Sequence, residues 1–310
     1  MDNLKLISQS QTLNSFVKTK TKNLSCGLLL SKDETLLNIL PKYISMALMC
    51  KKDIPCFVCS ECQKIASNNA IEVFSYPKFK DDISVKDIED FVNSLIKKPI
   101  DFDKKIYIFN RIDRASKEAQ NKLLKSMEEF PSYAILIFTA TNIRQVLPTI
   151  LSRVTTMFVP MIPYEEYNLI LSNYVKDEKT IPLNAIYDLA EGNLFSARNI
   201  LTDDNIKEIY NNCLEILNQI NIENINYYTQ LITKTNLEEY IKIFSMLISK
   251  MLKTKQNISD DFQTIVKKYT LKSLIKIAEL LHYSNKKIKS NTNEQSIIDN
   301  LLIGIMEAKI

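Results

Sequence analysis

Four cysteines, Cys50, Cys56, Cys59 and Cys62, lie close together near the start of the chain. The last three have the C-x-x-C-x-x-C spacing that suits tetrahedral thiolate ligation of zinc. We expect a cytosolic protein, because the N-terminus reads neither as a signal peptide nor as a membrane anchor. Disulfides are rare in that reducing compartment. Four protein ligands leave no open coordination position, so the pattern predicts a structural Zn²⁺ and not a catalytic one.

A second candidate for chemistry is Arg153, the last residue of the motif Leu147-Pro148-Thr149-Ile150-Leu151-Ser152-Arg153. Two apolar runs of strand length precede it, Ile106 to Phe109 and Ala134 to Phe138, with a helix expected between them over 116–129. Unbroken apolar runs indicate strands that are buried on both faces, as in a parallel sheet. Polar side chains follow the second strand, at the edge where open α/β sheets bind ligands: Thr139, Thr141 and Asn142.

These motifs resemble the AAA+ module of bacterial clamp-loader subunits, and most closely the ATPase-inactive delta-prime type of DNA polymerase III. The resemblance rests on Asp113-Arg114, on Leu147 to Arg153, and on the helix Ala119-Gln120-Asn121-Lys122-Leu123-Leu124-Lys125-Ser126-Met127-Glu128-Glu129-Phe130-Pro131. In this family the Ser-Arg element faces the neighbouring subunit, which implies that Arg153 contacts the phosphates of ATP bound there. The family also carries a four-cysteine zinc module after its first helix, where residues 50–62 lie here.

The sequence lacks the glycine-rich loop with which such proteins bind ATP phosphates. That loop has the form G-x-x-x-x-G-K-[ST] and follows the first strand, which we place at Cys26 to Leu30. Here Ser31-Lys32-Asp33-Glu34-Thr35-Leu36 follows instead, and its two carboxylates would repel a polyphosphate. The chain has only three glycines, Gly27, Gly192 and Gly304, so it has none to build the loop elsewhere.

The residues that bind magnesium and polarise water in an ATPase are also missing. A Walker B strand should end in Asp-Glu, but the strand from Ile106 to Phe109 continues into Asn110-Arg111. An arginine can serve neither role. Two independent losses therefore predict an AAA+ fold without a bound nucleotide.

The chain changes character near Pro160-Met161-Ile162-Pro163. Strand and helix patterns alternate before this point, as in a parallel-sheet module, and only helical patterns follow it. We therefore expect an α/β AAA+ (RecA-like) module over residues 1–160 with the zinc module at 50–62. A small helical lid over 161–203 and an all-α collar over 204–310 follow. The first 23 residues are expected to hold only a short apolar segment and a polar linker, and a second polar linker is expected before a helix that starts at Ser84.

The resemblance implies a non-catalytic, delta-prime-like subunit that supports loading of the sliding clamp onto primed DNA. Its implied partners are gamma/tau and delta subunits in a hetero-pentameric ring, with the clamp and primer-template DNA reached through the complex and no membrane involved. In the lid, Arg198 matches the position called sensor 2, and we interpret it as salt-bridging or solvated.

Two alternatives remain open. One is an active gamma-type ATPase with a disguised site, and the other is a stand-alone zinc-containing DNA-binding protein. The net charge of +4 is spread over 40 basic and 36 acidic residues, which supports no strong claim about nucleic acid.

Overall fold

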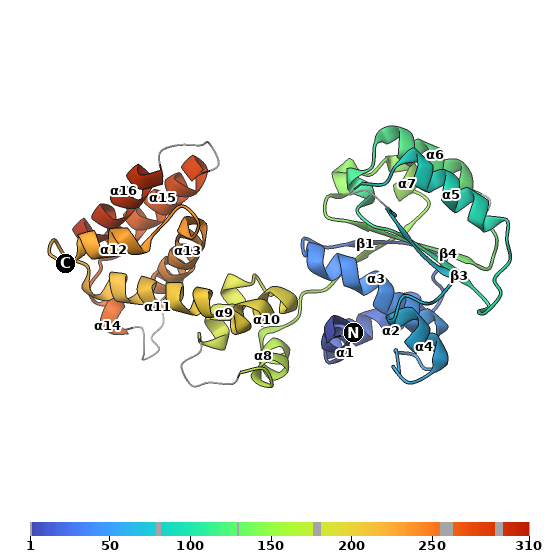
Figure 1. Ribbon diagram of the computed structural model, residues 1–310, viewed down its shortest axis with the longest axis horizontal. Coiled ribbons are helices and arrows are strands. Elements are labelled where there is room, and N and C mark those ends of the chain that lie inside the picture. Colours follow the sequence, from blue (N-terminus) through green and yellow to red (C-terminus); the bar gives the residue numbers. More distant parts are fainter. Residues whose placement is uncertain are drawn as a thin grey trace. The chain divides into compact units, whose positions relative to one another are not determined.

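The computed structural model describes residues 2–78, 82–128, 130–175, 181–254, 263–288 and 294–309. The chain forms two compact units, Met1–Ile170 and Leu171–Ile310, which we describe separately. The first unit is a parallel sheet with helices on both faces, and the described part of the second unit is built from helices (Figure 1).

The sheet of the first unit has five strands: β1 (Cys26–Leu30), β2 (Val73–Tyr76), β3 (Lys105–Phe109), β4 (Ala134–Ala140) and β5 (Thr155–Phe158). Their order is β2-β3-β4-β1-β5, and every neighbouring pair is parallel. Strands β1, β3 and β4 are buried along their whole length, which explains why their sequences are continuous apolar runs. The expected α/β architecture, a parallel-sheet module followed by helices, is confirmed.

Helices cover both faces of this sheet. They are α1 (Asp2–Ser8), α2 (Gln11–Thr21), α3 (Glu34–Met49), α4 (Ser60–Ala66), α5 (Val85–Leu95), α6 (Lys117–Glu128) and α7 (Pro148–Leu151), with the short 3₁₀ turns η1 (Ile112–Arg114) and η2 (Ile143–Gln145). The connection from β1 to β2 crosses the sheet in the opposite direction from the later ones. Right-handed crossovers therefore put α3, with α1, α2 and α4, on one face and α5 and α6 on the other (Figure 1).

Helix α5 shows how local sequence sets an element of this core. Ser84 and Asp87 form a capping box, as the spacing Ser84-Val85-Lys86-Asp87 predicts, and this fixes where the helix begins. Ile88 and Phe91 are fully buried against the sheet, where Phe91 packs edge-on against the ring of Phe109. The capping-box spacing in the sequence thus located the start of this helix.

The N-terminal segment differs from its expectation, because α1 and α2 replace the predicted linker. Both helices pack against α3 and bury several apolar side chains there: Leu4, Leu6, Ile7, Leu13 and Val17. Glu166, on α8 (Tyr164–Ser172), accepts hydrogen bonds at the start of α2 from the Thr12 N–H, at 3.1 Å, and from the Ser10 hydroxyl. A carboxylate is favoured at a helix N-terminus, so this contact stabilises α2.

The second unit contains α9 (Leu183–Leu189), α10 (Leu194–Thr202), α11 (Asp204–Gln219), α12 (Ile225–Leu231), α13 (Leu237–Thr254), α14 (Gln263–Val266), α15 (Leu271–Ile288) and α16 (Glu294–Glu307). Helix α13 packs against α9, α11 and α15, and α15 packs against α16. Gly304 permits α16 to approach α15 closely, because a Cβ at this position would lie 2.4 Å from the Cδ2 atom of Leu280 on α15. The sequence pattern predicts a helix over 260–269, part of which lies outside the described residues. Among the described helices, none is long and apolar enough to cross a lipid bilayer.

Candidate functional site

The first candidate site is the crevice at the carboxyl ends of β1 and β4, where strand order reverses and open α/β sheets bind ligands. The start of α3 lies here, and the amides of a helix N-terminus can bind a phosphate. In this chain the Asp33 side chain caps the helix by accepting the Leu36 N–H at 2.8 Å. The Ser31 hydroxyl accepts the Asp33 N–H at 3.1 Å. Side chains of the turn itself therefore already accept from the amides of Asp33 and Leu36, where a bound phosphate would otherwise do so.

The side chain of Arg111 occupies the same crevice. Its Nη1 lies 2.7 Å from Glu34 Oε1 on α3, its Nε lies 3.3 Å from Asp113 Oδ1, and its Nη2 donates to Thr141 Oγ1 at 3.0 Å. The Arg111 side chain is only 11% exposed and that of Asp113 only 1%. Arg114 extends the network with a 3.2 Å contact to Glu34. The guanidinium of Arg111 therefore pairs with the carboxylates of Glu34 and Asp113 in this crevice.

The polar residues after β4 also contribute to this network. Asp113 accepts from the N–H and hydroxyl of Thr141, at 3.1 and 3.0 Å, and from the Asn142 N–H at 3.2 Å. Burial acts to raise the pKa of Asp113, but the hydrogen bonds from Arg111 and Thr141 outweigh it and hold that pKa below its usual range. The Thr139 hydroxyl accepts the Arg111 N–H at 2.9 Å. Thr139, Thr141 and Asn142 therefore hydrogen-bond to the ion pair of Arg111 and Asp113.

The backbone of Arg111 is itself unusual. Its φ angle is 57°, in the left-handed region that residues other than glycine seldom adopt. Such a conformation costs on the order of 1 kcal/mol or more and persists only where surrounding contacts fix it. The ion pairs with Glu34 and Asp113 supply those contacts. Sequence reasoning treated Arg111 only as the loss of a catalytic carboxylate and missed this role.

Loss of the Arg111 charge should destabilise the first unit strongly. In Arg111→Met the buried Asp113 carboxylate loses its cation, and we expect the free energy of unfolding to fall by about 3 kcal/mol. The matched control is Arg114→Met, which removes a pair with both partners about half exposed and should cost no more than about 1 kcal/mol. Urea denaturation followed by circular dichroism measures both. Equal small effects would show that the network is not a buried ion pair.

The stability of the first unit should also depend on pH. For Glu166, as for Asp113, burial acts to raise the pKa, and hydrogen bonds from Ser10 and Thr12 outweigh it to lower the pKa. A group with a depressed pKa stabilises the fold fully above its unfolded value, about 4 for these carboxylates. This stabilisation is lost as the pH falls through the lower pKa that the carboxyl group has in the folded state. Urea midpoints measured from about pH 6 to about pH 3 should therefore fall, and fall less in Arg111→Met.

Arg153 lies at the surface of the first unit, two residues before β5. The preceding helix α7 starts with Pro148 at its first position and is anchored by the fully buried Ile150. The Arg153 side chain is 38% exposed, and its Nη2 lies 2.8 Å from Glu128 Oε1 at the end of α6. Its Nη1 donates to the Thr149 carbonyl at 3.0 Å and to the Ser152 hydroxyl at 3.3 Å. Contacts with Glu128, Thr149 and Ser152 therefore hold the Arg153 guanidinium at an accessible surface.

The four predicted zinc ligands come together in the structure. Cys50 follows the end of α3, Cys59 caps the start of α4, and all four Sγ atoms lie within 4.8 Å of one another. Tetrahedral zinc with Zn–S bonds of about 2.3 Å needs sulfur atoms about 3.8 Å apart. Amide N–H groups already point at three of the sulfurs: Lys52 to Cys50, Cys59 to Cys56 and Cys62 to Cys59, each at 3.4 Å. The donor set therefore fits a closed zinc site.

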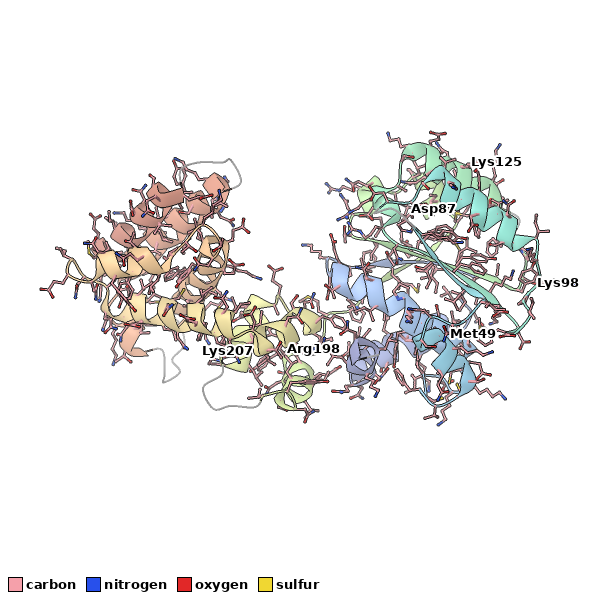
Figure 2. All side chains as sticks on the ribbon, in the orientation of Figure 1. Met49, Asp87, Lys98, Lys125, Arg198 and Lys207 are labelled. Carbon is pink, nitrogen blue, oxygen red and sulfur yellow. The ribbon has the colours of Figure 1, made fainter. Side chains whose placement is uncertain are left out.

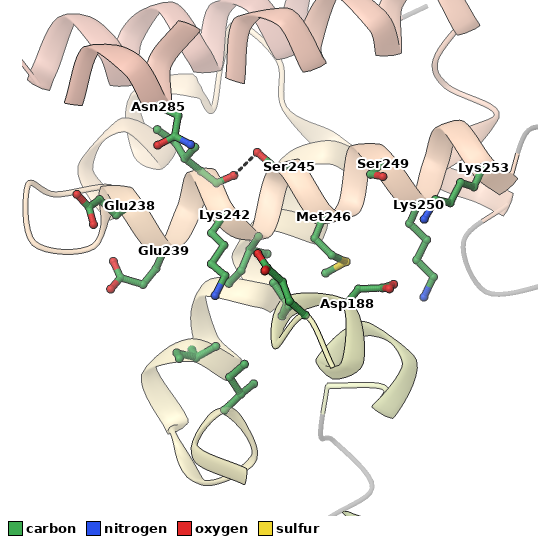
Figure 3. Close-up of a pocket in the computed structure, with 16 residues that line it drawn as sticks. Asp188, Glu238, Glu239, Lys242, Ser245, Met246, Ser249, Lys250, Lys253 and Asn285 are labelled. Carbon is green, nitrogen blue, oxygen red and sulfur yellow. Dashed lines mark hydrogen bonds between the residues drawn. The ribbon is translucent and has the colours of Figure 1, made fainter. Parts of the chain in front are cut away.

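The second unit contains Arg198 and a groove beside α13. Arg198, which is labelled in Figure 2, lies on α10 and is half-buried. A groove of about 820 Å³ lies between α13, which supplies Lys242 and Lys250, and α9, which supplies Asp188 (Figure 3). Its lining has charges of both signs, including Glu191 and Lys253. The groove therefore favours neither an anionic nor a cationic ligand.

Comparison with protein families identifies the group to which this chain belongs. The family described as "DNA polymerase III, delta subunit" matches residues 8–162, which is half of the chain and includes every strand of the sheet. The chain belongs to this family. The membership confirms the clamp-loader group of AAA+ proteins that the motifs ending at Arg153 indicated.

Individual relatives of this family member carry gamma-type names. The chain is 26% identical to the DNA polymerase III subunit gamma/tau of Mycoplasma genitalium over 256 residues, 79% of this chain and 41% of that protein. It is 25% identical to the DNA polymerase III subunit gamma of Buchnera aphidicola subsp. Schizaphis graminum over 279 residues, 83% of this chain and 75% of that protein. A DNA polymerase III gamma subunit-related protein of Thermotoga maritima aligns over 96% of this chain and 98% of that one, at 18% identity and a TM-score of 0.49. The chain spans less than half the length of several curated relatives.

Proposed function

We propose that this chain is a non-catalytic, delta-prime-like subunit of the DNA polymerase III clamp loader. The observation that carries the proposal is the crevice at β1 and β4, where Asp33 caps the helix and Arg111 binds Glu34 and Asp113. Two carboxylates and an internal guanidinium stand where a nucleotide-binding relative of this fold would need glycine amides, a lysine and a magnesium ligand. The chain then has no site for ATP of its own.

In this proposal the contribution of the chain to ATP hydrolysis is Arg153. A guanidinium is planar, always charged, and able to bind two phosphate oxygens at once. Presented to ATP on an adjacent gamma/tau-type subunit, Arg153 stabilises the charge that develops as the γ-phosphoryl group is transferred. Its exposure and its place on a turn anchored by Ile150 support this role.

Zn²⁺ is the proposed structural cofactor, held by Cys50, Cys56, Cys59 and Cys62. The ion would join the end of α3 to the start of α4 across residues 50–59, whose side chains are mostly exposed or half-buried. Four thiolates this close together would repel one another without a cation, so the metal and the module should fold together.

For the second half of the chain we propose the lid over 161–203 and the oligomerising collar over 204–310. Exposed apolar side chains on this half support an interface with other loader subunits, of the gamma/tau and delta type: Ile222, Tyr227, Leu271, Ile275 and Ile303. The sliding clamp and primer-template DNA are reached through the assembled ring, which we place in the cytoplasm.

The proposal is tested by clamp loading in a reconstituted system. Gamma/tau-type and delta-type subunits from the same source are combined with clamp, primed DNA and ATP, with and without this chain. We expect clamp to be retained on the DNA only when the chain is present, and the chain alone to hydrolyse no ATP. Clamp loading that is indifferent to the chain would contradict the proposal.

Two alternatives predict different results in the same system. The names of the relatives favour a gamma-type ATPase, which would hydrolyse ATP without partners. A stand-alone DNA-binding protein would bind primed DNA by itself, with an affinity that falls steeply as salt is raised.

A further inference from the structure

The position of Glu128 is unfavourable for the helix that carries it. Glu128 is the last residue of α6 (Lys117–Glu128), and a carboxylate at a helix C-terminus is repelled by the helix dipole. Its side chain is 56% exposed, so burial does not require it there. Glu128 forms a 2.8 Å ion pair with Arg153, which follows α7 in the chain. A role in holding Arg153 accounts for both facts.

The contacts of Arg153 leave part of its guanidinium available. A guanidinium has five N–H donors. Nη1 donates to Thr149 and Ser152, and one Nη2 hydrogen faces Glu128. Within the described part of the chain, the Nε–H and the second Nη2–H have no partner. Both of these N–H groups can donate to phosphate oxygens.

We propose that Glu128 is a positioning residue for the trans arginine finger. It fixes the guanidinium of Arg153 in one orientation before the neighbouring subunit's ATP arrives, with the Nε–H and one Nη2–H still able to donate. Because the side chain is already ordered, less rotamer freedom is lost when Arg153 contacts the γ-phosphoryl group in the transition state. This inference rests on the proposed function, since it assigns a role to Glu128 through Arg153.

The expected effect of Glu128 is modest, because exposed ion pairs are weak. Glu128→Ala in the assembled loader should lower ATP turnover at saturating ATP by about two- to fivefold, the factor that such a pair supplies. The ATP concentration for half-maximal rate should not change, since a group that acts in the transition state affects kcat. Glu128→Gln keeps an oxygen that accepts the Nη2–H, and its turnover should stay within about twofold of the wild type.

A double-mutant cycle with Arg153→Ala separates positioning from a general structural role. In the Arg153→Ala background, Glu128→Ala should have no further effect on turnover. The loss caused by Glu128→Ala alone should shrink as salt is raised, because the pair is exposed and screened. The matched control is Glu118→Ala. Glu118 is an exposed residue of the same helix with no contact to Arg153 among the described residues, so its loss should leave turnover unchanged.

The possible outcomes are distinguishable. A silent Arg153→Ala variant overturns the proposed function itself. A large loss in Arg153→Ala with an unchanged or faster Glu128→Ala variant overturns only the positioning role. Additive losses in the double variant also reject it, because they would show that Glu128 acts independently of Arg153.

Discussion

Replacing Arg153 with alanine should lower the ATP turnover of the assembled loader by about tenfold or more, with little change in the stability of the chain. Arginine fingers accelerate phosphoryl transfer by about 10³-fold or more at the site they serve. The loss in the whole ring is smaller because other subunits keep their own sites. The exposed ion pair with Glu128 contributes little to folding, so a direct structural effect should be at most about 1 kcal/mol.

The design of this experiment includes a matched variant. Arg144, on η2, is an exposed arginine of the same unit that precedes the α7 turn. Arg144→Ala removes the same charge from the same unit and should leave turnover within about twofold of the wild type, as expected for a surface substitution. Steady-state ATPase with clamp and primed DNA measures both. Equal turnover in the Arg153 variant and the wild type would mean that Arg153 touches no ATP.

Removing one zinc ligand should have the largest effect on the folding of the first unit. In Cys59→Ser we expect the bound zinc to fall from about one ion per chain to none, as for structural sites that fold with their metal. Loss of a structural metal typically costs more than about 4 kcal/mol of local stability. The segment between α3 and α4 should then exchange its amide hydrogens freely.

Metal content and hydrogen exchange test this expectation together. Cys213→Ala is the control, because Cys213 is a buried residue of α11 outside the cluster and its loss should leave zinc bound. A strong chelator should reproduce the effect of Cys59→Ser in the wild-type chain. A wild-type chain that contains no zinc and does not respond to the chelator would contradict the proposed zinc site.

Sequence patterns predicted the buried elements of the sheet well and its edges poorly. Strands β1, β3 and β4 are continuous apolar runs, and their positions follow directly from burial on two faces. Strands β2 and β5 have four residues each and lie at the two edges, where mixed exposure leaves no periodic pattern. Their place was fixed by pairing with β3 and β1, which depends on the rest of the fold.

The candidate sites divide in the same way. The cysteine cluster and the turn before Arg153 are local in sequence, so spacing and motif were enough to locate them. The pairing of Glu34 with Arg111, and of Glu128 with Arg153, joins residues from separate elements. No periodicity or spacing records such contacts, because they arise only when the crossovers bring α3 beside η1 and α6 beside α7.

The most direct test of the central claim is a titration of the isolated chain with ATP and magnesium by isothermal calorimetry. The charges at the crevice predict no binding up to about 1 mM, which corresponds to a binding free energy weaker than about −4 kcal/mol. Arg111→Met, which removes the guanidinium but leaves Asp33 and Glu34, should remain unable to bind. Saturable binding of ATP by the wild-type chain at micromolar concentration would contradict the account and identify the chain as an ATPase subunit.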